Sequence, residues 1–260
     1  MIKNLSLIAL LGVVAMGVPC ESYAKSAKVV TASKAGSPSS ITRQVANQMV
    51  TVEFYSPSIV RIVKSDASGN ASSVQKKSYS VILKLQHLKN ISVQEKGDIV
   101  TMKSTFITVS LNQKTGEIRF LSNDGKSLLT DTKTLLDARK DDANKGKYRI
   151  TQNFQLADDE AIYGLGQLHD SYMNQRGRKN IELWNHNTYI AIPYFTSEKG
   201  YGLYWDNAGK TYFNDSERTS FTSEVGTCAD YYFMYKDGTQ DGVIASIREL
   251  TGQATMFPKW

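Results

Sequence analysis

Short β-forming runs separated by turn residues recur along this chain as far as Tyr235, and they constrain its fold more than any other feature. Valine, isoleucine and phenylalanine dominate the runs on either side of Ser56-Pro57-Ser58. Residues that hairpin turns require follow at 66–70, 96–98, 113–116 and 123–125. The alternation in 106–111 and 117–121 predicts a hairpin. We therefore expect a mainly β chain folded as an antiparallel, two-sheet β-sandwich.

Helical periodicity is confined to residues 241–250. Apolar residues recur there at a spacing that places them on one helix face, and Asp241 lies near the start; they are Val243, Ile244, Ile247 and Leu250. The sandwich is thus expected to end in a C-terminal helix. Residues 137–147 are charged and rich in turn formers, which predicts an exposed loop.

The first residues are typical of a secretory signal. Lys3 precedes an apolar run over 5–18, and small residues flank a cleavage position near Ala24. The run is too short for a membrane span, which needs roughly 20 residues. We expect a signal peptide at 1–24, a lead-in at 25–40 and a periplasmic or secreted protein, with a lipid anchor at Cys20 as the alternative.

Charge and cysteine content narrow the function classes. The chain has 31 Lys and Arg against 25 Asp and Glu, scattered rather than clustered, so no nucleic-acid surface is predicted. Removal of the signal would leave Cys228 alone, as a buried thiol without a disulfide. The histidines lack metal-binding spacing, so neither a metal nor a cofactor is predicted.

The glycines of Gly164-Leu-Gly166 do not form a dinucleotide fingerprint. A third glycine is missing, and no convincing helix follows. The remaining interpretation is a tight turn or bulge in a sheet, where backbone can approach closely.

Residues 184–187 have the composition of a sugar-binding surface. Sugars present apolar C–H faces and hydroxyl groups, which suit an aromatic platform beside planar polar groups. Trp184, Asn185, His186 and Asn187 supply both. On a strand the two asparagines would face one way and the two rings the other. A sandwich core with polar edge residues is the alternative, and it is favoured for Trp205, with Asp206 and Asn207 in the turn that ends that strand.

Four pieces of the chain, in order, resemble the N-terminal region of glycoside hydrolase family 31, the α-glucosidases and α-xylosidases. The pieces are Tyr163-Gly-Leu-Gly166, Trp184-Asn-His-Asn187, Ile192-Pro-Tyr-Phe195 with Gly200-Tyr-Gly-Leu203, and Leu250-Thr-Gly-Gln253 with Pro258-Lys-Trp260. No single piece is specific for this family, but the order and spacing of the four together are.

The resemblance implies a β-sandwich of the galactose-mutarotase-like type over 41–236, then a helix and connection over 237–260 to a (β/α)8 barrel. It implies that a loop at 176–187 reaches the active site. Asn187 stands where many members carry a sugar-contacting Asp, and Gln167 stands where many carry Glu. These departures favour an α-xylosidase-like branch.

The family's retaining mechanism uses two aspartates on barrel strands, about 5 Å apart. No residue up to Trp260 matches either one, so no catalytic residue is assigned, including among Asp170, Glu182, Asp206 and Asp215. We expect the N-terminal portion of an exported α-glycosidase, inactive alone, with an α-linked oligosaccharide and a missing catalytic barrel as partners. The main alternative is a stand-alone carbohydrate-binding module. A mutarotase-type epimerase is weaker, because no general acid and base can be named.

Overall fold

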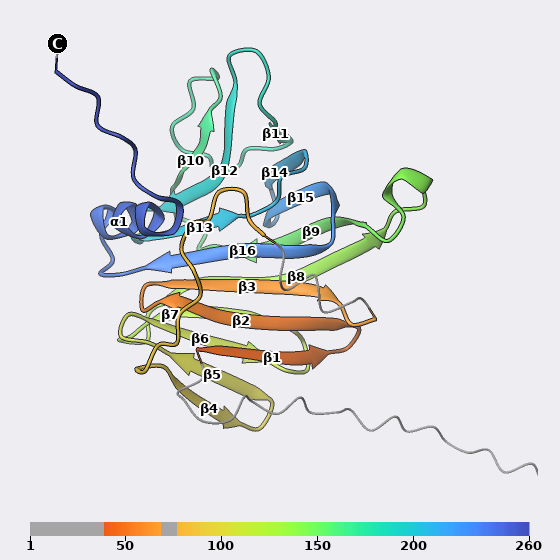
Figure 1. The fold of residues 1–260 in the computed structure, drawn as a ribbon, viewed down its shortest axis with the longest axis vertical. Helices are drawn as coiled ribbons and strands as arrows, with labels where there is room; N and C mark the ends of the chain where they lie inside the picture. The colour runs from red at the N-terminus through yellow and green to blue at the C-terminus, as the bar shows by residue number, and fades with distance from the viewer. Residues whose placement is uncertain (1–38, 69–76, 260) are drawn as a thin grey trace, which may run out of the picture.

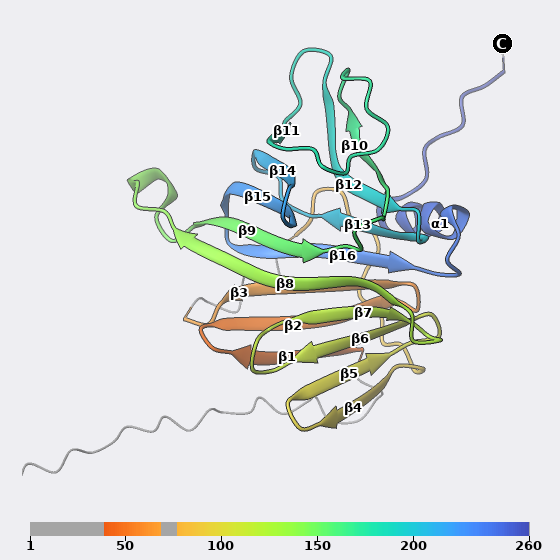
Figure 2. The same cartoon turned by 180° about the vertical axis from the view of Figure 1, so that it is seen from behind.

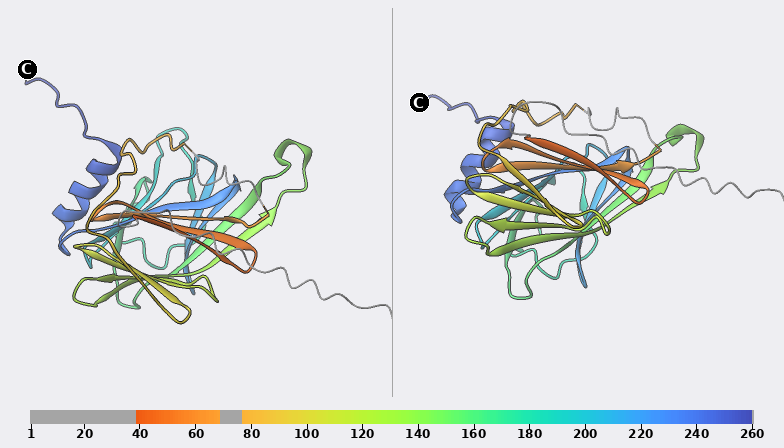
Figure 3. Two further views of the ribbon diagram at one scale, coloured as in Figure 1. Left: turned by 60° about the horizontal axis from the view of Figure 1, so that its bottom comes forward. Right: turned by 90° about the horizontal axis from the view of Figure 1, so that it is seen from below.

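The structure, a computed structural model, describes residues 39–68 and 77–259. The predicted signal peptide, Cys20 and most of the predicted lead-in at 25–40 lie outside the described residues. The described chain forms two antiparallel sheets packed face to face with one α-helix at their edge (Figures 1 and 3). The predicted mainly β sandwich with a C-terminal helix is confirmed.

One sheet has seven strands. In spatial order they are β1 (Ser40–Val45), β2 (Gln48–Ser56), β3 (Ile59–Asp66), β16 (Cys228–Tyr235), β13 (Tyr201–Trp205), β12 (Ile190–Ser197) and β10 (Ile162–Gln167). β1, the first described strand, thus lies at one edge of this sheet, and β16 joins β1–β3 to β13, β12 and β10.

The other sheet has nine strands. In spatial order they are β11 (Ile181–Leu183), β14 (Thr211–Asp215), β15 (Thr219–Gly226), β9 (Tyr148–Gln155), β8 (Ser127–Ala138), β7 (Ile118–Ser122), β6 (Ile107–Asn112), β5 (Ile99–Lys103) and β4 (Ser92–Lys96). The short 3₁₀ helix η2 (Asp142–Asn144) lies in the β8–β9 connection.

Local turn chemistry sets most of the neighbouring strand pairs. The predicted turns at 56–58, 96–98, 113–116 and 123–125 each join two antiparallel neighbours. Gly97, Gly116 and Gly125 have positive φ, a conformation that glycine adopts without steric cost. The predicted hairpin of 106–111 and 117–121 is β6 with β7. The predicted exposed loop at 137–147 is the β8–β9 connection, although β8 extends to Ala138.

The core between the sheets is rich in aromatic rings. Phe120 on β7 stacks on Phe233 on β16, with ring centroids 4.2 Å apart. Trp205 is fully buried, stacks on Phe221 at 5.7 Å, and donates its indole N–H to Ser223 Oγ at 2.9 Å. A buried indole needs such an acceptor. The prediction that Trp205 belongs to the core is confirmed, as is the burial of Cys228.

A buried polar network also joins the two sheets. Lys64 Nζ on β3 lies 2.7 Å from Asp131 Oδ1 on β8, and both side chains are almost completely buried. Gln152 Nε2 donates to the same carboxylate at 2.7 Å, and the Tyr231 hydroxyl donates to its other oxygen. Burial and the neighbouring carboxylate raise the pKa of Tyr231. Each charge is therefore paired and hydrogen-bonded, as burial requires.

Helix α1 (Gln240–Thr251) covers part of the outer face of the seven-stranded sheet. Thr239 caps its start by accepting the Gly242 N–H at 3.0 Å, and Gly252 ends it at a φ of +95°. Val243 and Leu250 are buried as predicted, but Ile244 is 51% exposed. The buried stripe runs through Val243, Ser246 and Leu250, so the prediction that Ile244 shares this face is wrong.

Candidate functional site

Two loops stand out from one end of the sandwich (Figures 1 and 2). Residues 168–180 join β10 to β11, and residues 184–189 join β11 to β12. β10 and β12 pair in the seven-stranded sheet, whereas β11 pairs with β14 in the nine-stranded sheet. The segment predicted as one loop at 176–187 therefore includes β11, a short strand of the nine-stranded sheet, with part of one loop before it and part of the other after it.

A glycine bulge fixes the base of this projection. The β10–β12 register shifts between Gly164 and Gly166, which have φ values of +125° and +103°. A Cβ at Gly166 would lie 2.0 Å from the Ile190 carbonyl oxygen. The prediction of a bulge with close backbone approach is confirmed, and its effect is to hold β12 tightly against β10.

Residues 184–187 do not continue the strand. β11 ends at Leu183, and the chain reverses through a turn in which Tyr189 N–H donates to His186 O at 2.9 Å. Asn187, inside that turn, has a φ of +49°. The predicted strand-like alternation of the asparagines and rings is therefore wrong. The alternative that buries Trp184 in the core is also wrong, because 54% of its surface is exposed.

Four rings gather along these loops. The His186 and Tyr189 rings are stacked, 5.0 Å apart and within 6° of parallel. Trp184 lies 6.2 Å from His186 on one side, and His169 lies 5.7 Å from Tyr189 on the other. His169 Nε2 donates to Thr188 O at 2.9 Å, which ties the two loops together. The result is an aromatic row in which Trp184, His169 and His186 are exposed and Tyr189 is half-buried, and its exposed rings suit the C–H faces of a sugar.

The polar side chains of the row differ in which hydrogen-bonding groups remain available to a ligand. His186 Nδ1 donates to Trp184 O at 2.9 Å, which leaves Nε2 as an acceptor. Asn185 Oδ1 accepts the Ala191 N–H at 2.6 Å, so this side chain braces the loop. The exposed Asn187 amide makes no side-chain hydrogen bond within the described ranges. Asn187 and His186 can therefore receive a ligand, whereas Asn185 offers only its amide N–H groups.

A pocket of about 340 Å³ adjoins the row and is called here the Trp184 pocket. A separate pocket of about 400 Å³ lies on the nine-stranded sheet. The walls of the Trp184 pocket include Trp184, Asn185, Pro193, Tyr204, Asn207 and Lys210. Lys210 Nζ lies 5.0 Å from the Trp184 ring centroid and 3.1 Å from Glu182 Oε2. Hydrogen bonding to Tyr212 and Glu182 raises the pKa of Lys210. The Trp184 pocket lies at the small end of the range for ligand sites, about 300–1,000 Å³.

Ion pairs anchor the loop at 168–180. Arg176 Nε lies 2.8 Å from Asp215 Oδ2, and Arg178 NH2 lies 2.5 Å from Asp170 Oδ2. The hydrogen bond from Arg178 lowers the pKa of Asp170. Three of the four carboxylates weighed from the sequence, those of Asp170, Glu182 and Asp215, thus have basic partners, and Asp206 is buried. The contacts of Asp170 and Asp215 anchor the loop at 168–180. They do not identify any two of the four carboxylates as a catalytic acid and base.

Within residues 39–68 and 77–259, no group of three His, Cys, Asp or Glu side chains could hold a metal ion. Over the same ranges, no helix is long and apolar enough to cross a membrane.

Sequence reasoning missed three members of this surface. Tyr189 and His169 complete the aromatic row, and Lys210 joins the Trp184 pocket from the β13–β14 connection. Tyr189 could have been found from its place two residues after Asn187, the last residue of the 184–187 motif. Lys210 carries no sequence signal, because only the pairing of β11 with β14 brings it beside Trp184.

Comparisons with known proteins agree on the family. A model described as the glycosyl hydrolase 31 N-terminal galactose mutarotase-like domain matches residues 49–214. The α-xylosidase of Saccharolobus solfataricus is 28% identical over 84% of this chain and 30% of its own length. Aspergillus niger α-xylosidase A is 36% identical over 41% of this chain and 14% of its own length. The chain thus spans less than a third of these relatives.

Solved structures share the fold. A family 31 α-xylosidase from Xanthomonas citri superposes with a TM-score of 0.77 at 19% identity, over 85% of this chain and 40% of that one. The Flavobacterium johnsoniae family 31 dextranase does so with a TM-score of 0.72 at 25% identity, over 85% of this chain and 28% of that one. The match over 49–214 carries the assignment: this chain belongs to glycoside hydrolase family 31, through that family's N-terminal galactose mutarotase-like domain.

Proposed function

We propose that this chain is the N-terminal β-sandwich portion of an exported α-glycosidase whose substrate is an α-linked oligosaccharide. The observation that carries the proposal is the family match over 49–214. The names of the relatives, α-xylosidases and a dextranase, support hydrolysis of α-glycosidic bonds, with α-xylosides as the first substrates to test.

In this proposal the sandwich is a scaffold, and residues 184–189 form a loop that borders the active site. Trp184, His186 and Asn187 contact a sugar there, while Asn185 holds the loop against β12. The C-terminal segment after α1 and the two loops extend toward the same end of the molecule (Figures 1 and 2), which supports a catalytic barrel at that end. The barrel supplies the two catalytic carboxylates of the retaining mechanism.

The decisive assay compares two proteins. The purified 260-residue chain is expected to give no hydrolysis of p-nitrophenyl α-xyloside or α-glucoside above the blank. A polypeptide that continues through the downstream reading frame into a barrel is expected to hydrolyse one of them. Turnover by the 260-residue chain alone, or a downstream frame that encodes no barrel, contradicts the proposal.

The loop's role is tested in the longer protein. Asn187→Ala is expected to lower kcat/KM about tenfold, the cost of one lost hydrogen bond to substrate. Asn90→Ala, at an exposed turn asparagine outside the loops, is the control and leaves kcat/KM unchanged. Equal effects of the two substitutions would remove Asn187 from the site.

A stand-alone carbohydrate-binding module is the competing function, favoured by the exposed Trp184 at the edge of a pocket. Calorimetry of the 260-residue chain with xyloglucan oligosaccharides and malto-oligosaccharides separates the two. A scaffold without its barrel is expected to show no measurable heat. Binding that Trp184→Ala abolishes would instead establish the module.

Export is tested by cell fractionation. The chain with residues 1–24 is expected outside the cytoplasm, and a chain starting at Lys25 is expected to remain inside. Equal distribution of the two would contradict a signal function for 1–24.

A further inference from the structure

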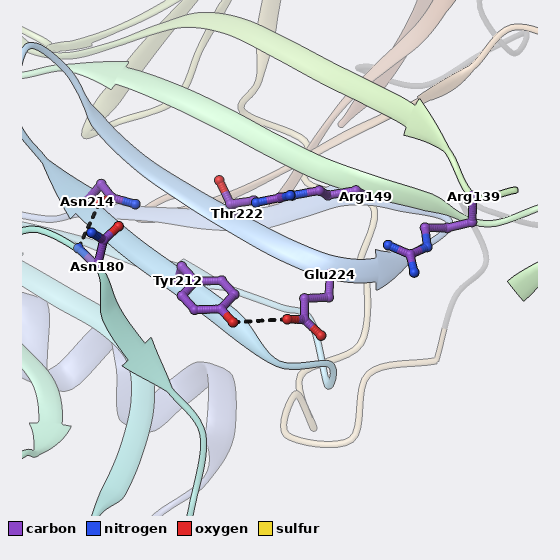
Figure 4. Close-up of a pocket in the computed structure, with 7 residues that line it drawn as sticks. All are labelled: Arg139, Arg149, Asn180, Tyr212, Asn214, Thr222 and Glu224. Carbon is purple, nitrogen blue, oxygen red and sulfur yellow. Dashed lines mark hydrogen bonds between the residues drawn. The ribbon is translucent and has the colours of Figure 1, made fainter. Parts of the chain in front are cut away.

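A second pocket, called here the arginine pocket, lies on the outer face of the nine-stranded sheet (Figure 4). It has a volume of about 400 Å³ and is lined by Arg139, Arg149, Asn180, Tyr212, Asn214, Thr222 and Glu224. Tyr212 and Asn214 on β14 alternate with buried residues, and Glu224 on β15 follows buried Ser223; Thr222 is buried, with its hydroxyl 3.0 Å from that of Thr151. Strand alternation therefore directs these polar side chains outward together.

The floor of the arginine pocket is ordered by hydrogen bonds. The Tyr212 hydroxyl donates to Glu224 Oε1 at 3.0 Å, and Asn214 Oδ1 accepts the Asn180 N–H at 2.8 Å. Glu224 keeps its second carboxylate oxygen as an acceptor, and Asn214 keeps its NH₂ group as a donor. The floor thus offers both a donor and a strong acceptor to a ligand with hydroxyl groups.

Two arginines form the opposite wall. Arg149 projects from β9 over β15, and Arg139 projects from the end of the β8 region toward the same space (Figure 4). Arg149 makes no ion pair or side-chain hydrogen bond with any residue in 39–68 or 77–259. Arg139 pairs with Asp141 at 3.0 Å, a contact in which both side chains are more than a third exposed and which contributes little. The wall therefore offers guanidinium donors to an anion.

We propose that the arginine pocket binds a carboxylate-bearing sugar, a uronate residue of a glycan. The sugar carboxylate lies against Arg149 and Arg139, since a guanidinium matches a carboxylate with two parallel hydrogen bonds. The ring hydroxyls lie on Glu224 and the Asn214 amide.

The chemistry of the floor separates this ligand from phosphate. A phosphate dianion carries two negative charges and a single P–OH donor, so most of its oxygens are acceptors that the nearby Glu224 carboxylate repels. A uronate brings hydroxyl donors to Glu224 and its charge to the arginines. The site does not depend on the proposed hydrolysis, because its residues lie outside the loops at 168–180 and 184–189 except for Asn180.

The test uses the 260-residue chain labelled with ¹⁵N and titrated with three probes: a glucuronic-acid-substituted xylo-oligosaccharide, the unsubstituted xylo-oligosaccharide and inorganic phosphate. The acidic oligosaccharide is expected to shift the backbone amides of Arg149, Thr222 and Glu224 saturably at millimolar concentration. Arg149→Gln is expected to weaken this binding about tenfold. Glu224→Gln is expected to weaken it while improving phosphate binding, because the repelling charge is removed.

Arg119→Gln is the matched control. Arg119 is an exposed arginine on β7, on the outer face of the same sheet and two strands from β9. The Arg119→Gln variant is expected to bind the acidic oligosaccharide as tightly as the unchanged chain does. No shift with the acidic oligosaccharide, equal binding of the neutral one, tighter binding of phosphate to the unchanged chain, or equal losses in the Arg119 and Arg149 variants would each overturn the proposal.

Discussion

Trp184 and Trp205 lie close in the sequence and on neighbouring parts of the molecule, yet one is 54% exposed and the other is fully buried. Trp205 sits on β13 between the sheets, stacked on Phe221 and hydrogen-bonded to Ser223. Trp184 sits just past β11, where a turn carries the chain away from the sheet. The difference shows that one aromatic segment serves two purposes: its buried part stabilises the sandwich core, and its exposed part is accessible to a ligand.

The largest expected effect tests this comparison directly. Trp205→Ala should lower the free energy of unfolding by roughly 3–5 kcal/mol, because it removes a large buried ring and leaves a cavity. Trp184→Ala should change it by less than about 1 kcal/mol. Urea unfolding followed by circular dichroism measures both. Similar losses in the two variants would show that Trp184 is structural.

The glycine bulge that joins the two regions gives the next effect. Gly166→Ala places a Cβ 2.0 Å from the Ile190 carbonyl oxygen at a φ of +103°, so β10 must separate locally from β12. The expected cost is about 1–3 kcal/mol, with faster hydrogen exchange at the amides that pair β10 with β12.

Gly177→Ala is its control. Gly177 has a φ of +73° but nothing within 4 Å of an added Cβ, so only backbone strain of about 1 kcal/mol is expected. Unchanged exchange at the paired β10 and β12 amides in Gly166→Ala would argue against a tight contact between these strands.

Alkaline pH is expected to lower the stability of the fold through Tyr194. Burial raises the pKa of Tyr194 to about 12, since desolvation disfavours the phenolate. The neutral phenol is favoured in the fold, so its contribution is complete below pH 10 and is lost as pH rises toward 12. Tyr194→Phe cannot ionise and should flatten the loss of stability between pH 10 and 12, on the order of 1 kcal/mol. Superimposable stability profiles for the two proteins would contradict this assignment.

Acid should act weakly on the exposed loops. The pKa of Asp170 is lowered by the Arg178 hydrogen bond, so the pair's contribution is present above the ordinary carboxyl range near pH 4 and is lost as pH falls below it. Amide shifts in 168–180 should move below about pH 4, with less than about 1 kcal/mol involved. Asp170→Asn should remove that pH dependence, while Glu95→Gln, at an exposed pair on the sandwich, should leave it intact.

Short-range sequence patterns predicted the parts of the fold that depend on neighbouring residues, namely the hairpin turns and the glycine bulge. Gly97, Gly116 and Gly125 each occupy a positive-φ turn position, so the hairpins could be read from neighbouring residues. The bulge at Gly164 and Gly166 was predicted for the same reason. Ile244 was misplaced because a four-residue apolar pattern on a short helix fits two adjacent faces, and packing against the sheet chose the one through Ser246.

The candidate site was predicted only in part. Trp184, His186 and Asn187 are exposed together as a sugar site requires, but Asn185 spends its oxygen on the Ala191 N–H. Sequence could not show this contact, because it depends on the turn that returns the chain to β12. The arginine pocket could not be predicted from the sequence at all. Its walls come from the end of β8 and from β9, β14 and β15, which are far apart along the chain.

The sequence by itself determined the mainly β class, the hairpins, the terminal helix and the family, because turn chemistry, alternation and motif order are all local properties. The tertiary structure alone decided that Trp184 is exposed, which asparagine has a free amide, and which residues Lys210 and the two arginines approach. These outcomes depend on the register and order of strands far apart in the chain, and short-range patterns carry no information about them.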